Sequence, residues 1–222
     1  MDRTEYPRPQ FVRNEWMNLN GIWDIRFDNE LEWKRINVPF AFQSVLSGIG
    51  TNQMVDNITY RRNFEIPKKW KGKRIILHFG AVDYFCKVTI NGCYLGSHEG
   101  GNVPFSFDIT DNLSWDVEQV IVEVWDPCGD ETIPRGKQYW LDKTDSIWYT
   151  RTSGIWQTVW LEPINKYSVK KVKFTPNLDE GTVAIDIDFL YIKQNQQLDI
   201  DIFMKDESVI SIKLKKLWVN HF

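Results

Sequence analysis

Short runs of β-branched and aromatic residues, each bounded by Gly, Pro, Asn or Asp, recur along most of this 222-residue chain. Runs of this kind predict strands, at residues 22–27, 59–66, 74–79, 86–90, 120–125 and 155–161. Helical periodicity is nearly absent between them. Short strands without intervening helices predict an all-β fold, a sandwich or jelly roll in which two sheets each bury one face.

One turn is predicted with particular clarity. Residues 87–90 alternate polar and apolar side chains, and Asn91-Gly92 follows directly. This pair is well suited to the positive φ angles of a type I′ turn, so a hairpin is expected here.

The character of the sequence changes after Pro163, because only one of the 11 Trp residues lies beyond it. Strands are predicted at 182–189 and 197–205, with Asp186, Asp188, Asp199 and Asp201 facing solvent. We therefore expect a first domain at 1–163 and a second at 164–222. The second is shorter than the roughly 100 residues of an immunoglobulin-like sandwich, so the sequence is expected to stop partway through a domain.

Composition argues against several classes of partner. The net charge of −3 gives no general attraction to nucleic acid or anionic lipid, and the one basic cluster, at residues 68–74, is interpreted as a solvated turn. The N-terminus lacks the apolar core of a signal peptide, and no run approaches the roughly 18 apolar residues of a membrane span. A cytoplasmic protein without membrane contact is expected, although removal of a signal peptide would leave the same pattern.

Sites for metals, cofactors or nucleophilic catalysis are not predicted. Three cysteines without metal-ligand spacing favour reduced thiols. His78 lies in a strand pattern and His98 in a Gly-rich turn, so no catalytic triad or histidine metal site is indicated. A calcium site is conceivable at Asp126, Asp130 and Glu131, but their spacing fits no known loop and we predict no metal.

Residues 127–152 form a long polar segment in which Gly129, Pro134 and Gly136 mark turns. Loops of this length in compact domains are usually functional or disordered. Its aromatic residues, Tyr139, Trp140, Trp148 and Tyr149, argue for order. Aromatic faces stack on sugars but also fill sandwich cores, and most of the chain's aromatic residues are interpreted as core.

Several stretches together resemble the N-terminal sugar-binding domain of glycoside hydrolase family 2, which includes β-galactosidases, β-glucuronidases and β-mannosidases. They are NLNGIW at 18–23, VPF at 38–40, YRRNF at 60–64, LHFGAVD at 77–83, VTING at 88–92 continuing to residue 110, PRGKQ at 134–138, IWYT at 147–150 and TSGIWQTVWL at 152–161. The likeness covers about residues 8–163 and implies a galactose-binding-like jelly roll. Residues 169–187 resemble the start of the immunoglobulin-like domain that follows in the family.

The resemblance also implies what this chain lacks. In the family, two glutamates on a later (β/α)₈ barrel carry out hydrolysis, and this sequence contains no such barrel. No catalytic residue is therefore expected here. The implied role is to support the barrel and to lend a loop to the sugar site.

Four residues are candidates for contacting the sugar. The resemblance places Asp126 at a strand end where some members contact substrate, and Arg135, Lys137 and Gln138 lie in the loop beyond it. A carboxylate accepts hydrogen bonds from vicinal hydroxyl groups, and the other three side chains supply donors. The alternative is that the loop is purely structural. Asp83, Asn91 and Gly92 are interpreted as architectural.

Two other functions remain open. A jelly roll rich in aromatic residues is also typical of a free-standing carbohydrate-binding module. The front domains of large glycosidases often contribute subunit contacts, so an assembly role in a homo-oligomer is the third possibility. Which glycoside the parent enzyme would cleave is not determined by these residues.

Overall fold

A computed structural model describes residues 3–28, 30–192, 197–204 and 207–214. Within these ranges the chain is built from strands β1–β16 and three short 3-10 helices, which confirms the predicted all-β class. The residues form two compact units, Met1–Pro163 and Ile164–Phe222. Each unit is described by itself.

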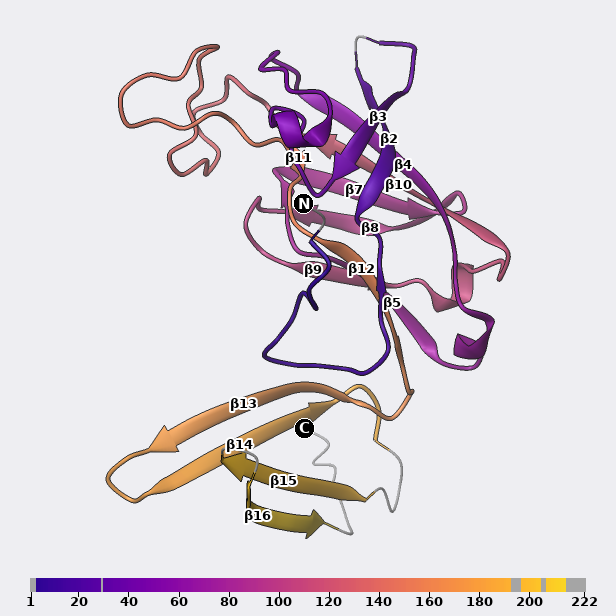
Figure 1. Cartoon of the computed structure of the whole chain (residues 1–222), viewed down its shortest axis with the longest axis vertical. Helices are drawn as coiled ribbons and strands as arrows, with labels where there is room; N and C mark the ends of the chain where they lie inside the picture. The colour runs from indigo at the N-terminus through magenta and orange to yellow at the C-terminus, as the bar shows by residue number, and fades with distance from the viewer. Residues whose placement is uncertain (1–2, 29, 193–196, 205–206, 215–222) are drawn as a thin grey trace. The chain divides into compact units, whose positions relative to one another are not determined.

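The larger sheet of the first unit has six strands in the order β3-β2-β4-β10-β7-β8 (Figure 1). Their bounds are Lys34–Val38 for β3, Gly21–Phe27 for β2, Asn57–Glu65 for β4, Val117–Trp125 for β10, Phe85–Ile90 for β7 and Cys93–Glu99 for β8. Every neighbouring pair is antiparallel. The long pairing of β10 with both β4 and β7 fixes the ends of three strands near residue 125.

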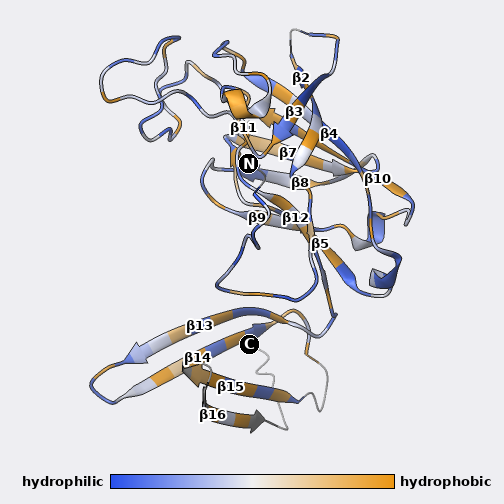
Figure 2. Cartoon of the chain, in the orientation of Figure 1, coloured by the Kyte–Doolittle hydropathy of each residue, from blue (hydrophilic) through white to orange (hydrophobic). Residues whose placement is uncertain are grey.

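The smaller sheet has four strands in the order β1-β12-β5-β9. They span Met17–Asn18, Val159–Ile164, Arg74–Phe79 and Phe105–Asp108, in that order. One hydrophobic cluster, built from residues 19–161 of both sheets, fills the sandwich. Alternation produces it, because in β2 the side chains of Trp23, Ile25 and Phe27 are buried while those between them are not. Figure 2 shows hydrophobic and hydrophilic residues interspersed along the strands.

The predicted hairpin is confirmed. Asn91 and Gly92 join β7 to β8 with φ angles of 49° and 80°, the positive values that a type I′ turn requires. The Asn91 side chain also accepts a hydrogen bond from the backbone N–H of Gln119 at 2.8 Å, which ties the turn to β10.

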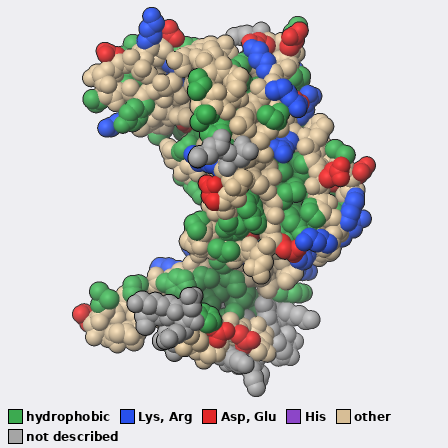
Figure 3. Space-filling view, viewed as in Figure 1, with side chains coloured by type: hydrophobic (Ala, Val, Ile, Leu, Met, Phe, Trp, Pro, Cys, Tyr) green, Lys and Arg blue, Asp and Glu red, His purple; other side chains and the backbone are tan. Residues whose placement is uncertain are grey.

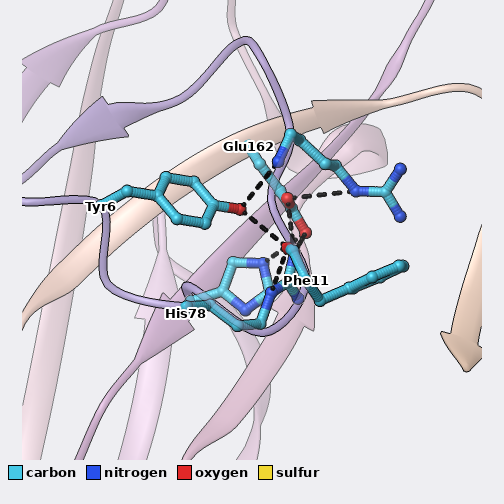
Figure 4. A network of polar contacts seen from close by, with 6 residues as sticks. Tyr6, Phe11, His78 and Glu162 are labelled. Carbon is cyan, nitrogen blue, oxygen red and sulfur yellow. Dashed lines mark hydrogen bonds and ion pairs between the residues drawn. The ribbon is translucent and has the colours of Figure 1, made fainter. Parts of the chain in front are cut away.

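Strand β12 is buried on both faces, unlike the other long strands of the first unit. Its outward-facing Glu162 is 2% exposed because the N-terminal segment, residues 3–16, covers it. Arg8 donates two hydrogen bonds to the Glu162 carboxylate at 2.8 and 2.9 Å, and Arg13 and His78 lie 3.2 and 3.0 Å from its oxygens (Figure 4). This cluster, the Glu162 clamp, fixes the N-terminal segment to the sheet.

One predicted strand is two separate strands. Residues 155–161 divide into β11, Gly154–Ile155, which pairs with β6, Val82–Asp83, and β12, which belongs to the smaller sheet. Gln157 lies between them, and its Cβ would be 2.7 Å from a Cβ added at Gly80, so the chain passes close to a glycine there. Figure 1 shows β11 at the end of the first unit from which residues 127–152 extend, and β11 pairs with β6, which ends at Asp83.

The second unit consists of two antiparallel hairpins. Strands β13, Val169–Asn177, and β14, Thr182–Phe189, form the first, and β15, Leu198–Met204, and β16, Glu207–Leu214, form the second. Asp186, Asp188, Asp199 and Asp201 are exposed, as predicted, while the isoleucines between them are partly buried. An apolar groove of about 630 Å³, lined by residues of β13, β14 and β15, lies within this unit.

Candidate functional site

Three of the four predicted sugar-contacting residues lie together. Asp126, Arg135 and Gln138 line one small cavity at the base of the 127–152 loop, with Asp83 and Arg151. The two aspartates come together because each lies at the end of a strand: Asp126 directly follows β10, and Asp83 is the last residue of β6. We call these five residues the acidic pocket.

The two carboxylates of the acidic pocket are buried, with Asp83 5% and Asp126 8% exposed. Burial, and next the negative charge of Asp126, raise the pKa of Asp83 to about 6. Burial also raises the pKa of Asp126, against the opposing effects of a hydrogen bond from Ser153 and the positive charge of Arg135. The pocket therefore holds carboxylates that bind protons more readily than ordinary aspartates.

Gln138 is engaged at both ends of its amide. Its Nε2 donates to Asp83 Oδ2 at 2.8 Å, and its Oε1 accepts from the backbone N–H of Thr152 at 2.6 Å. A side chain held in this way joins the middle of the loop both to its end and to β6. Its free capacity to bind a sugar hydroxyl is small, so the geometry favours an anchoring role.

Arg135 has N–H groups that are not used in hydrogen bonds to the described residues. Its Nη1 donates to the Cys128 carbonyl at 3.2 Å, whereas its Nε and Nη2 are buried and make no hydrogen bond to the described residues. Buried donors without partners are costly, so Arg135 is the pocket residue best suited to meet a ligand.

Lys137 lies apart from the acidic pocket. Its side chain is exposed, and its Nζ is 6.0 Å from the centroid of the Tyr149 ring across the loop. Backbone hydrogen bonds from Tyr149 N to Lys137 O and from Tyr139 N to Tyr149 O hold the two arms of the loop side by side. These bonds join the two arms of the loop next to its aromatic residues.

Sequence reasoning missed two members of the acidic pocket. Asp83 was interpreted as architectural, although its position at a strand end, like that of Asp126, is a usable signal. Arg151, 6% exposed, donates to the carbonyls of Leu141 and Asn52 at 2.6 and 2.8 Å. No spacing in the sequence indicated that role.

The acidic pocket is nearly full. Its cavity is about 10 Å³, which is close to the space of one water molecule. A pyranose ring does not fit between Asp83 and Asp126 in this arrangement. The site can therefore touch a sugar at its rim but not enclose one.

Other chemistry has little support in the described part of the chain. No group of three or more His, Cys, Asp or Glu side chains is placed to hold a metal ion there. All three cysteine thiols are free, with Cys86 and Cys128 buried and Cys93 exposed. Among the described residues, no helix has the length and hydropathy needed to cross a membrane.

Comparison with known proteins identifies the family. Residues 20–163 match the sequence profile of the sugar-binding domain of glycosyl hydrolases family 2. The chain is 32% identical over 169 residues to a β-galactosidase of Thermoanaerobacter pseudethanolicus and 30% identical over 158 residues to a β-glucuronidase of Formosa agariphila. These alignments cover 75% and 67% of this chain but only 22% and 16% of the relatives.

Solved structures show the same fold. A β-glucuronidase of Ruminococcus gnavus superposes with a TM-score of 0.70 at 21% identity, over 96% of this chain and 38% of that one. A β-glucuronidase from Ruminococcus gnavus in complex with D-glucuronic acid gives a TM-score of 0.68 at 23% identity, over 96% of this chain and 40% of that one. The chain thus spans well under half the length of these relatives. Because the matched profile covers most of its first unit, the chain belongs to glycoside hydrolase family 2.

Proposed function

We propose that this chain is the non-catalytic N-terminal portion of a β-glycosidase, and that its 127–152 loop forms one wall of a sugar site completed by a catalytic domain. In this proposal residues 164–222 are the opening of an immunoglobulin-like domain. The relatives named above suggest a β-galactoside or β-glucuronide as the substrate class.

The observation that carries the proposal is the acidic pocket itself. It presents two buried carboxylates and an arginine with unused donors, yet it leaves only about 10 Å³ of space. Polar groups of this kind suit sugar hydroxyls, but the lack of a sugar-sized cavity indicates a partial site.

The same geometry argues against hydrolysis by the chain alone. Glycosidases place two carboxylates on either side of the scissile bond, with the sugar between them. Asp83 and Asp126 have the required chemistry, but the cavity beside them excludes the ring. Neither is assigned a catalytic role.

The proposal is tested by titrating the isotopically labelled chain with methyl β-galactoside and methyl β-glucuronide while following backbone amide NMR signals. A partial site predicts weak binding, with Kd of about 1 mM or higher, centred on residues 126–138. Arg135→Ala should abolish these shifts, whereas Arg26→Ala, a substitution on the outer face of β2, should leave them unchanged.

The competing function is a free-standing carbohydrate-binding module. A specific feature favours it, a groove of about 920 Å³ beside the edge strand β3 that includes Asn18, Asn37 and Arg35. Binding with Kd near 10 µM, with shifts in β3 and none in the loop, would replace our proposal with this one.

A further inference from the structure

The outer part of the 127–152 loop carries an aromatic cluster. The rings of Tyr139 and Trp140 meet edge to face with centroids 4.8 Å apart, and Trp140 meets Trp148 in the same way at 5.1 Å. Tyr139 and Trp148 lie nearly parallel, at 18° and 6.1 Å. These three rings pack on one another and none of them is fully buried.

Further apolar surface surrounds the cluster. Tyr149 is 64% exposed, Ile147 64% and Leu141 52%. Charged side chains border it, with Lys137, Asp142, Lys143 and Asp145 all exposed, and Figure 3 shows hydrophobic and charged groups interspersed at the outer end of this region (upper left). Exposed aromatic rings bordered by charged groups suit a ligand that has an apolar face and polar edges.

The aromatic cluster continues from the wall of the acidic pocket. Gln138 lines the pocket and Tyr139 is the next residue. Arg151 also lines the pocket, and its Nη1 donates to the Leu141 carbonyl beside the cluster at 2.6 Å. A molecule touching Arg135 at the pocket rim therefore has the aromatic surface close beside it.

We infer that Trp148 and Tyr149, supported by Tyr139 and Trp140, form a stacking surface for the aglycone of a β-glycoside, the group beyond the scissile oxygen. This inference rests on the proposed function and specifies its substrate class. The aglycones that fit have a flat apolar face, such as an aryl group or a second pyranose ring. Stacking on aromatic side chains recognises such faces without requiring a closed cavity.

A purely structural role for the rings makes a different prediction. Rings that serve only to stiffen the loop would all be covered by the loop itself, but Tyr149 forms no ring pair with the described residues and is more than half exposed. Lys137 Nζ lies 6.0 Å from the centroid of its ring. The ring of Tyr149 is therefore accessible to a ligand, and its substitution tests the inference.

The experiment compares 4-nitrophenyl and methyl β-glycosides of the same sugar, using the backbone and Trp indole NMR signals of the complete chain. The aryl glycoside should bind at least about fivefold more tightly, with indole shifts at Trp140 and Trp148. Tyr149→Ala and Trp148→Leu should remove this preference, and Trp148→Phe should retain it. Tyr94→Ala is the matched control, because Tyr94 is 62% exposed on β8, and it should change nothing.

The controls also separate this inference from the proposed function. Unchanged amide signals of Gln138 and Thr152 will show that each variant keeps the loop anchored. Equal affinity for the two glycosides, with Arg135-dependent binding intact, overturns the inference alone. Absence of binding by both glycosides overturns it together with the proposed function. Concentration-dependent broadening of the indole signals without glycoside would assign the surface to a second copy of the chain, which also overturns the inference.

Discussion

At Gly154 the backbone of β11 lies directly against the ring of Tyr60. A Cβ added there would be 2.1 Å from the Tyr60 hydroxyl oxygen, and the glycine has a φ of +80°. Real Cβ contacts do not approach that closely, and Tyr60 is fully buried, so neither partner can move easily. The base of the loop therefore depends on one residue without a side chain.

We predict that Gly154→Ala lowers the free energy of unfolding by more than about 2 kcal/mol, because it combines a clash with an unfavourable φ. Chemical denaturation measures the loss. Gly129→Ala is the control, since no atom lies within 4 Å of its added Cβ, and it should change stability by less than about 0.5 kcal/mol. Equal effects of the two substitutions would contradict the packing shown here.

Asp83 predicts a pH dependence. With its pKa raised from 3.8 to about 6, the folded chain binds this proton more tightly than the unfolded chain does. Stability from this group is present at low pH and is lost as pH rises between these values, by about 2 to 3 kcal/mol. Asp83→Asn, which cannot ionise, should raise Tm at pH 7 and leave it nearly unchanged at pH 4.

Thermal unfolding of both proteins across pH 4 to 8 checks this sign. The packing allows the isosteric change, because the Asp83 carboxylate already occupies the space beside Gly101, where an added Cβ would lie 2.0 Å from Oδ1. A variant that is less stable at every pH would mean that the charged carboxylate stabilises the pocket, contrary to our account.

At the scale of elements, the Glu162 clamp explains why β12 is buried on both faces. Burial alone raises the pKa of Glu162, but the hydrogen bond with His78 and the charges of His78, Arg8 and Arg13 outweigh it, so the pKa is lowered. Burial lowers the pKa of His78 despite its bond to Glu162. Acid therefore weakens the clamp in two ways. It removes the negative charge of Glu162, and it places a positive charge on the buried ring of His78.

Glu162→Gln should destabilise the first unit by about 3 kcal/mol at pH 7, since it leaves two arginines facing a neutral amide in a buried setting. Hydrogen exchange should rise in residues 6–13. The difference from the native chain should begin to shrink as pH falls below 4.5, the ordinary pKa of a glutamate, and should vanish only below the lowered pKa of Glu162 in the folded chain. Glu30→Gln removes a more exposed pair with Lys34 and should cost less than about 0.5 kcal/mol. An equally small effect of Glu162→Gln would show that the clamp does not hold the segment.

Local pattern was sufficient for most strands and for the hairpin. The alternation in β2 and the Asn91-Gly92 pair act through nearest neighbours, so the sequence predicts them directly. The split of residues 155–161 was not predictable, because it follows from the approach of Gln157 to Gly80, which is distant in sequence. Gln138 was identified as a site residue, but its two hydrogen bonds depend on Asp83 and Thr152, which only the fold brings to it.

At the scale of the whole molecule, the core and the candidate sites for sugar belong to the first unit. The described hydrophobic cluster ends at Leu161, and the acidic pocket and the aromatic cluster lie within residues 83–151. The second unit has an apolar groove of its own, of about 630 Å³. The role proposed for the acidic pocket follows from the family resemblance, and the fold adds that the pocket, at about 10 Å³, is too small to enclose a sugar.

We propose that this chain contributes to a sugar site without catalysing hydrolysis. The most direct measurement is release of 4-nitrophenol from aryl β-galactoside, β-glucuronide and β-mannoside by the purified chain at high concentration. Our account predicts no turnover above background for the native chain, Asp83→Asn or Asp126→Asn. Turnover by the native chain that either substitution abolishes would contradict it, because a catalytic carboxylate would then lie in the acidic pocket.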